Sequence, residues 1–210
     1  MIVGLLGEGS SDSLLIPPIR WLLSDLDSTR EFRIEQIDLR VLRHPPRSLD
    51  ERIAAACREA PRNLLLVHRD ADASNARRRY DEIDRAVEKA SAKEPAVVNV
   101  AIVPVVPVRM TEAWLLIDEA AIRKAARSAG SRVSLDMPSI GAIETLPDPK
   151  RHLDDLLLAA SETTGRRRRR FRPERSRHDI AAFIEDWHAL DDLVAFRELR
   201  TRLAAVLERP

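Results

Sequence analysis

The first half of the chain alternates short apolar runs with amphipathic stretches. Apolar runs occupy residues 2–6 and 64–67, and β-branched residues dominate 97–108. A short, unbroken apolar run is typical of a strand buried on both faces of a sheet. Imperfect alternation of apolar and polar residues over 32–41 predicts a further strand, with a bulge near Gln36. Four strands are therefore expected before residue 109.

The stretches between these strands have the period and the start signals of helices. One helix is expected to begin at the Ser-Ser-Asp of residues 10–12, and another follows the capping box formed by Ser48 and Glu51. A third covers residues 75–93 with one apolar stripe. The order β-α-β-α-β-α-β predicts an α/β fold of the TOPRIM or Rossmann-like type: a mostly parallel, four-stranded sheet with helices on both faces.

Helical periodicity without strands characterises the second half. We expect helices over residues 112–130, 150–162, 179–187 and 191–207. Their apolar residues should pack on the core: Trp114, Leu115, Ile122, Ala125, Ala129, Phe183, Trp187, Leu193, Phe196, Leu199 and Leu203. We therefore divide the chain into an α/β domain, residues 1–118, and a helical extension packed on it, residues 119–210.

Acidic side chains follow three of the predicted strands. Glu8 follows the first, Asp70 and Asp72 the third, and Glu112 the fourth. Parallel strands end at one edge of the sheet, where ligands collect. Asp70 and Asp72 point the same way along an extended segment, and a divalent cation between them would relieve their repulsion. Alternatively, both aspartates cap a loop or helix, and Glu112 only complements a helix dipole.

A Glu-Gly after the first strand and an Asp-x-Asp after the third resemble the TOPRIM domain of topoisomerases, primases and OLD-type nucleases. With the Thr-Glu-Ala-Trp of residues 111–114, the chain also resembles the bacterial domain of unknown function 4276 family, which is TOPRIM-like. The resemblance implies that Asp70 and Asp72 bind Mg²⁺ and that Glu8 is a general acid/base or a further ligand. It also implies a role in bacterial defence or DNA processing. Tyr80, the only tyrosine, lies in a predicted helix core, which argues against topoisomerase activity.

The acidic residues carry this chemistry independently of the family. Cleavage of a phosphodiester needs an activated water and neutralised phosphoryl charge, and metal ions held by carboxylates supply both. Oxygen ligands favour Mg²⁺ or Mn²⁺ over zinc. We therefore expect Glu8, Asp70, Asp72 and Glu112 to form a catalytic metal site in a nuclease. The alternatives are a non-catalytic nucleic-acid or partner-binding module and a small-molecule phosphohydrolase.

Basic residues supply candidate phosphate contacts. Arg109 follows the fourth strand and Lys150 begins a predicted helix. The segment 163–178, interpreted as an Arg-rich loop, contains the densest basic run: Arg166, Arg167, Arg168, Arg169 and Arg170, followed by Phe171. Arginines release counterions from nucleic acid, and Phe171 offers a stacking surface for a base. The alternatives are a solvated loop, arginines paired with the acidic residues 185–192, and a solvent-facing Lys150.

Composition narrows the class of protein only broadly. Among 210 residues, 44% are hydrophobic and 33% charged, with a net charge of +1, so no global field favours nucleic acid. The single cysteine, Cys57, excludes an internal disulfide and is expected to be buried in a cytoplasmic protein. We expect no secretory leader and no membrane span. The five histidines lack zinc-ligand spacing, and His68 is assigned a structural role.

Overall fold

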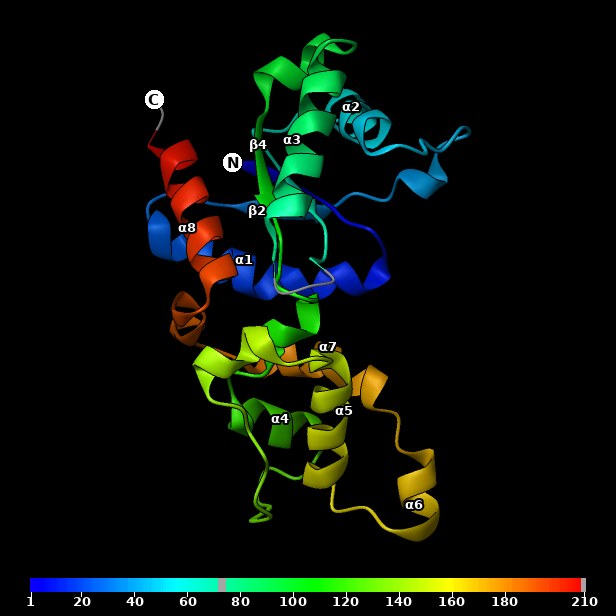
Figure 1. The fold of residues 1–210 in the computed structure, drawn as a ribbon, viewed down its shortest axis with the longest axis vertical. Helices are drawn as coiled ribbons and strands as arrows, with labels where there is room; N and C mark the ends of the chain where they lie inside the picture. Colours follow the sequence, from blue (N-terminus) through cyan, green and yellow to red (C-terminus); the bar gives the residue numbers. More distant parts are fainter. Residues whose placement is uncertain (72–74, 209–210) are drawn as a thin grey trace.

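A parallel four-stranded sheet lies at the centre of the α/β part of the molecule (Figure 1). The computed structural model describes residues 1–71 and 75–208. The strands follow the order β2-β1-β3-β4 and are β1 (Ile2–Leu6), β2 (Arg33–Gln36), β3 (Leu64–His68) and β4 (Ala101–Val105). The predicted fold class, with its parallel sheet, is confirmed.

β3 is a central strand of the sheet, and all five of its residues are buried. It pairs with β1 on one side, where Val3 lies opposite Leu64, and with β4 on the other, where Pro104 lies opposite Val67. β2 and β4 form the two edges of the sheet. Pro104 lacks an N–H group, and an edge strand tolerates that loss because it needs hydrogen bonds on one side only.

Helices cover both faces of the sheet. Alternate strand residues divide between two apolar clusters, as the two-residue period of a strand requires. Val3, Leu64 and Val103 belong to the cluster that includes α1 (Ile16–Leu26) and α8 (Val194–Leu207). Leu65 and Val67 belong to the cluster under α2 (Leu49–Glu59) and α3 (Arg77–Ser91). The predicted two-sided covering is therefore present, and Cys57 is buried in α2 as expected.

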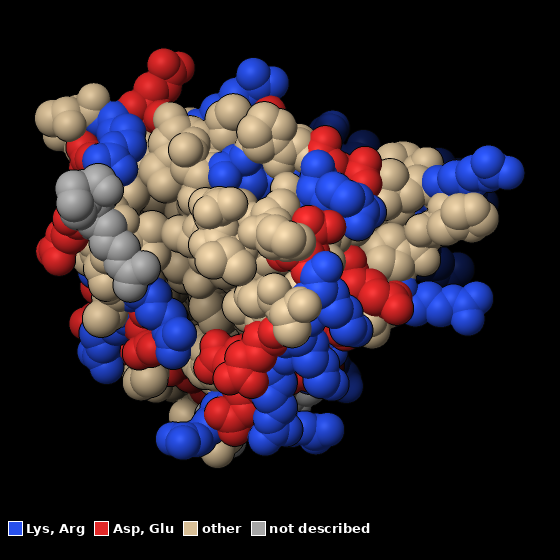
Figure 2. Space-filling view, turned by 90° about the horizontal axis from the view of Figure 1, so that it is seen from above, with Lys and Arg blue, Asp and Glu red and all other residues tan. Residues whose placement is uncertain are grey.

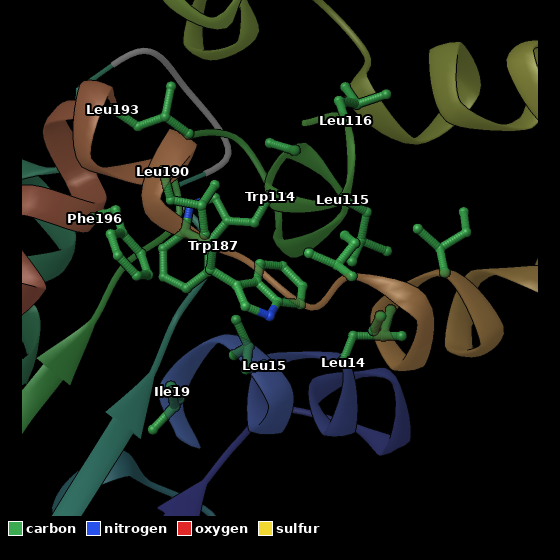
Figure 3. Packing of buried hydrophobic residues seen from close by; sticks show 14 of the residues in the cluster. Leu14, Leu15, Ile19, Trp114, Leu115, Leu116, Trp187, Leu190, Leu193 and Phe196 are labelled. Atoms are coloured by element: carbon green, nitrogen blue, oxygen red, sulfur yellow. The ribbon is translucent and has the colours of Figure 1, made fainter. Parts of the chain in front are cut away.

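The second half of the chain is helical and shares the larger apolar cluster with the sheet. Its α-helices are α4 (Glu119–Ala125), α5 (Pro149–Ala160), α6 (Gly165–Arg170), α7 (Pro173–Phe183) and α8. Short 3₁₀ helices occur in both halves of the chain: η1 (Ser10–Leu15), η2 (Leu39–Val41), η3 (Pro95–Asn99), η4 (Thr111–Leu115), η5 (Ile140–Thr145) and η6 (His188–Asp192). Figure 3 shows Leu15 and Ile19 facing Trp114 and Trp187 across this cluster. Trp114 meets Phe196 edge to face, with ring centroids 5.2 Å apart.

Three predicted elements are shorter than expected. The alternation over residues 32–41 ends as a strand at Gln36, because Asp38 accepts a hydrogen bond from the Arg40 amide and begins η2. β4 starts at Ala101, after η3. The predicted helix over 112–130 is divided, because the side chain of Asp118 caps a new helix, α4, after η4. α4 ends at Ala125, so Ala129 lies outside the helix and is exposed.

The interpretation of residues 163–178 as a loop is wrong. The arginine run forms α6, and α7 begins at Pro173. Arginine is a good helix former, so a dense run of it favours a helix wherever charge repulsion is screened by solvent. α6 buries none of its residues and extends away from the sheet (Figure 1). Phe183, expected in the core, is also 39% exposed.

Charge is interspersed on the end of the molecule seen in Figure 2. Lysine and arginine side chains alternate with acidic ones around an uncharged centre, and neither sign forms a continuous field there. Within the part of the chain that the structure describes, no helix has the length and apolar character needed to cross a membrane.

Candidate active site

Glu8 and Asp70 lie at the same edge of the sheet. Glu8 is the second residue after β1, and Asp70 is the second residue after β3, which pairs directly with β1. Sheet pairing continues past the end of β3, where the amides of Arg69 and Ala71 donate to the carbonyls of Val105 and Pro107, each at 3.1 Å. Because the residues on both sides of Asp70 pair with the segment that continues β4, the backbone position of Asp70 is fixed relative to the sheet.

A buried histidine connects two carboxylates at this edge. Nδ1 of His68 lies 3.4 Å from Oδ1 of Asp12, and its Nε2 lies 3.2 Å from Oδ1 of Asp70. The first contact lacks hydrogen-bond alignment and acts as an ion pair. The Thr111 hydroxyl lies 3.3 Å from both His68 Nε2 and Asp70 Oδ1. Asp12 and His68 are only 4% and 2% exposed, so this is an internal charged cluster.

Asp12 also shapes the turn that carries Glu8. Its Oδ2 accepts hydrogen bonds from the amides of Glu8 at 2.5 Å and Gly9 at 2.8 Å. A Cβ at Gly7 would lie 2.0 Å from the same oxygen, so only glycine fits there. The turn after β1 therefore holds Glu8 in place through a buried carboxylate.

The electrostatics of the cluster favour a protonated histidine. Burial opposes the charge on His68, but the contacts with Asp12 and Asp70 outweigh burial and raise its pKa from 6.5 to about 9. Burial likewise opposes ionisation of Asp12, whereas His68 and the two turn amides lower the pKa of that carboxyl. At neutral pH the buried pair is therefore an Asp12 carboxylate and a His68 imidazolium.

This pKa predicts a pH-dependent stability. A histidine whose pKa is raised by folding stabilises the protein fully below the unfolded value, near 6.5, and this contribution is lost as pH rises through about 9. The free energy of unfolding should fall by about 3 kcal/mol across that interval. Denaturant titrations in chelator at several pH values measure it. His68→Gln should lack the fall, and parallel curves for the two proteins would contradict the assignment.

Glu8 and Asp70 are also connected through arginines. Arg69 contacts Glu8 at 2.8 Å and Glu82, on α3, at 2.9 Å. Arg79 contacts Glu82 at 2.7 Å and donates to the backbone carbonyl of Asp70 at 2.9 Å. The Glu8 side chain is 38% exposed, so its ion pair with Arg69 is solvent-screened and contributes about 0 to 1 kcal/mol. The Arg69 side chain is only 20% exposed, and Glu82 would remain its partner if Glu8 turned to another cation.

Glu112 lies beside two cations. It is 5% exposed and follows Thr111 directly, which links it to the His68 cluster. Lys150 Nζ lies 3.2 Å from Glu112 Oε1, and Arg177 lies 3.6 Å from the same atom. Nε and Nη2 of Arg177 also donate to the carboxylate of Asp154, at 2.6 to 3.0 Å. The structure thus brings Lys150 to one predicted site residue, Glu112, whose carboxylate it shares with Arg177.

The remaining predicted residues have different placements. Asp72 lies outside the described residues. Arg109 adopts a left-handed backbone conformation, φ 62°, and its guanidinium donates to the carbonyl of Pro147 at 3.5 Å. The five arginines of α6 are exposed and form no ion pair among residues 1–71 and 75–208, so the predicted pairing with residues 185–192 is absent there. Phe171 packs against the larger apolar cluster instead of standing free.

Asp12, Thr111, Arg69 and Arg177 were missed as site residues, and His68 was taken as structural. Two of these had a signal in the sequence. Asp12 lies one helical turn after Glu8, and His68 precedes Asp70 by two residues, which is the spacing of one strand face. Arg177 has no such signal, because its place depends on how α7 packs against η4.

The oxygen donors at this edge suit Mg²⁺ chemically. Mg²⁺ commonly binds one or two carboxylates and keeps several waters. Glu8 and Asp70 are partly exposed carboxylates at one edge, with side chains 38% and 27% accessible. Within the described residues, no three His, Cys, Asp or Glu side chains are close enough to hold a metal by themselves. The described residues thus form no preformed metal site, and metal binding at this edge stays a prediction.

The chain has no detected relatives that would identify this site. No protein-family model, no curated protein and no solved structure matched it in the comparisons. The resemblance to TOPRIM proteins stays a prediction from the residues that carry it.

Proposed function

We propose that this protein is a metal-dependent nuclease that cleaves phosphodiester bonds in nucleic acid, on a TOPRIM-like fold. The observation that supports the proposal most is the arrangement of Glu8 and Asp70 after adjacent parallel strands, with a buried charged cluster beneath them. Chemistry at the carboxyl edge of such sheets is common. The proposal extends to Asp72 through its spacing from Asp70.

The chain's own residues divide the work of the proposed reaction. Glu8 and Asp70 would hold Mg²⁺ or Mn²⁺, which when bound polarises the phosphate and lowers the pKa of a water. Thr111 and His68 hold Asp70 in one orientation. Lys150, which is exposed, would supply positive charge to the phosphate, and its ion pair with Glu112 holds it beside η4. If Glu8 held a metal, it would give up its contact with Arg69, which would keep Glu82 as a partner.

One observation favours a second candidate, a nucleic-acid or partner-binding module without catalysis. Each described carboxylate of the candidate site already has a cationic partner: Glu8 has Arg69, Asp70 has His68, and Glu112 has Lys150 and Arg177. Such pairing satisfies the acidic charge without a metal. In such a module, nucleic acid or a protein partner would be bound by the exposed basic residues of the chain and not by a metal.

A nuclease panel separates the two candidates. The purified chain is incubated with labelled single- and double-stranded DNA and RNA in Mg²⁺, Mn²⁺ or chelator, and binding is followed in parallel. We expect cleavage with metal and none with chelator. Binding without turnover in either metal would instead support the module. Bis(p-nitrophenyl) phosphate and p-nitrophenyl phosphate as extra substrates test the phosphohydrolase, which would favour the monoester.

A further inference from the structure

A cleft lies directly beside Glu8, on the side away from Asp70's strand. Its walls are the turn after β1 and the segment between β2 and α2, and its volume is about 350 Å³. Pockets of about 300 to 1,000 Å³ accept small ligands or single residues of larger ones. The lining includes Gly7, Gly9, Gln36, Arg47, Pro46 and Arg52 as well as Glu8. The cleft is thus continuous with the candidate active site.

Two arginines of this cleft lack carboxylate partners. Arg52 is half-buried in α2 and donates to the carbonyl of Gly7, but no ion pair within the described residues includes it. Burial, and after it the charge of Arg69, lower the pKa of Arg52, and the charges of Glu8 and Asp12 offset this only in part. Arg47 is exposed, and among residues 1–71 and 75–208 its one hydrogen bond is the one that its backbone amide donates to Glu51.

A third arginine in the cleft differs from these two. Arg40 contacts both carboxylate oxygens of Asp38, each at 2.8 Å. That pair is internally neutral and offers little to an anion. The lining as a whole holds Arg40, Arg47 and Arg52 against Glu8 and Asp38, a net charge of +1, and a phosphate group is the ligand that a guanidinium matches best.

The cleft also has a surface that suits a flat ring. Pro45 and Pro46 add rigid apolar rings to its lining, which also includes Ile37. Gln36 is exposed and anchored by a 3.2 Å hydrogen bond from its Nε2 to the carbonyl of Gly9. Its remaining amide donor and its acceptor oxygen suit the edge of a base. A cleft whose lining combines arginines with flat apolar rings has the chemistry of a nucleotide site.

We propose that this cleft binds the nucleotide next to the phosphodiester that Glu8 and Asp70 cleave. Arg47 and Arg52 hold its phosphate, and Gln36 and the two prolines contact its base. The inference rests on the proposed nuclease function and narrows its substrate. A base enters a cleft of this size only after leaving the helical stack, so the substrate is single-stranded at the cleavage point.

Nucleotide binding in chelator tests the cleft without relying on catalysis. Thymidine 5′-monophosphate and thymidine are titrated into the full chain and followed by NMR at the amides of Gly7 and Gly9 and the carboxamide of Gln36. We expect saturable shifts with the monophosphate and much weaker ones with the nucleoside. Arg52→Gln should weaken binding about tenfold, as loss of a charged hydrogen bond does. Equal affinity for both ligands, or shifts elsewhere only, would overturn the cleft.

Two further variants keep the outcome clear. Arg47→Gln, at an exposed position, should weaken binding similarly without affecting folding, whereas Arg20→Gln, on α1, should bind as wild type. In the nuclease assay, Arg47→Gln should raise KM for a single-stranded oligonucleotide and leave kcat unchanged. Cleavage by wild type with an unchanged KM in Arg47→Gln overturns the subsite but not the nuclease. Nucleotide binding without any cleavage overturns the nuclease alone.

Discussion

Replacing Glu8 by glutamine should lower the nuclease rate by about a thousandfold, the usual scale for removing one preorganised charge from a reaction centre. Glutamine keeps the shape of the side chain and its amide but cannot carry the negative charge that a metal ligand or general base requires. The measurement is single-turnover cleavage of a single-stranded oligonucleotide in Mg²⁺. Folding should be unaffected, because the Glu8 side chain is 38% exposed and its ion pair with Arg69 is screened.

Glu82 provides a matched control for this prediction. It contacts the same arginine, Arg69, at 2.9 Å, compared with 2.8 Å for Glu8, and its side chain is 34% exposed. Glu82 lies on α3 and not on the turn after β1. Glu82→Gln should therefore cleave within a few-fold of wild type. An equal loss in both variants would mean that Arg69 needs a carboxylate partner and that Glu8 has no role in the chemistry.

The sheet could be predicted because its strands have strong local signals. The apolar run before His68 needs no partner to identify it as a buried strand, and Pro104 identifies an edge. The predicted length of β2 is too great because Leu39 continues the apolar alternation. Leu39 is buried, as a strand residue would be, but it reaches the core from a 3₁₀ turn. A periodic pattern records burial and not the backbone conformation that produces it.

The candidate site could be predicted only where strand order decides it. Glu8 and Asp70 follow from the rule that parallel strands end at one edge. The partners of these residues depend on side-chain packing between distant segments. Thr111 reaches Asp70 across 41 positions, and Arg177 reaches Asp154 across 23. No spacing in the sequence encodes these two contacts, whereas the positions of Asp12 and His68 relative to Glu8 and Asp70 give a local signal for part of the charged cluster.

The buried cluster predicts the second large effect, on stability. Asp12→Ala should lower the free energy of unfolding by about 3 to 5 kcal/mol at neutral pH, because it leaves a buried imidazolium with one carboxylate fewer. It also removes the acceptor for the amides of Glu8 and Gly9. Urea denaturation in chelator measures the loss. Asp38→Ala, which removes a carboxylate bonded to the exposed Arg40, should have a much smaller effect.

A double-mutant cycle separates the two causes of this loss. If the ion pair with His68 dominates, Asp12→Ala should cost much less in a His68→Gln background, where no buried cation remains to be compensated. If the turn amides dominate, the cost should be the same in both backgrounds. The 3.4 Å contact and the raised pKa of His68 favour a coupling of about 2 kcal/mol. Coupling near zero would mean that Asp12 acts on Glu8 through the turn alone, and the pH-dependent stability would then have to come from Asp70.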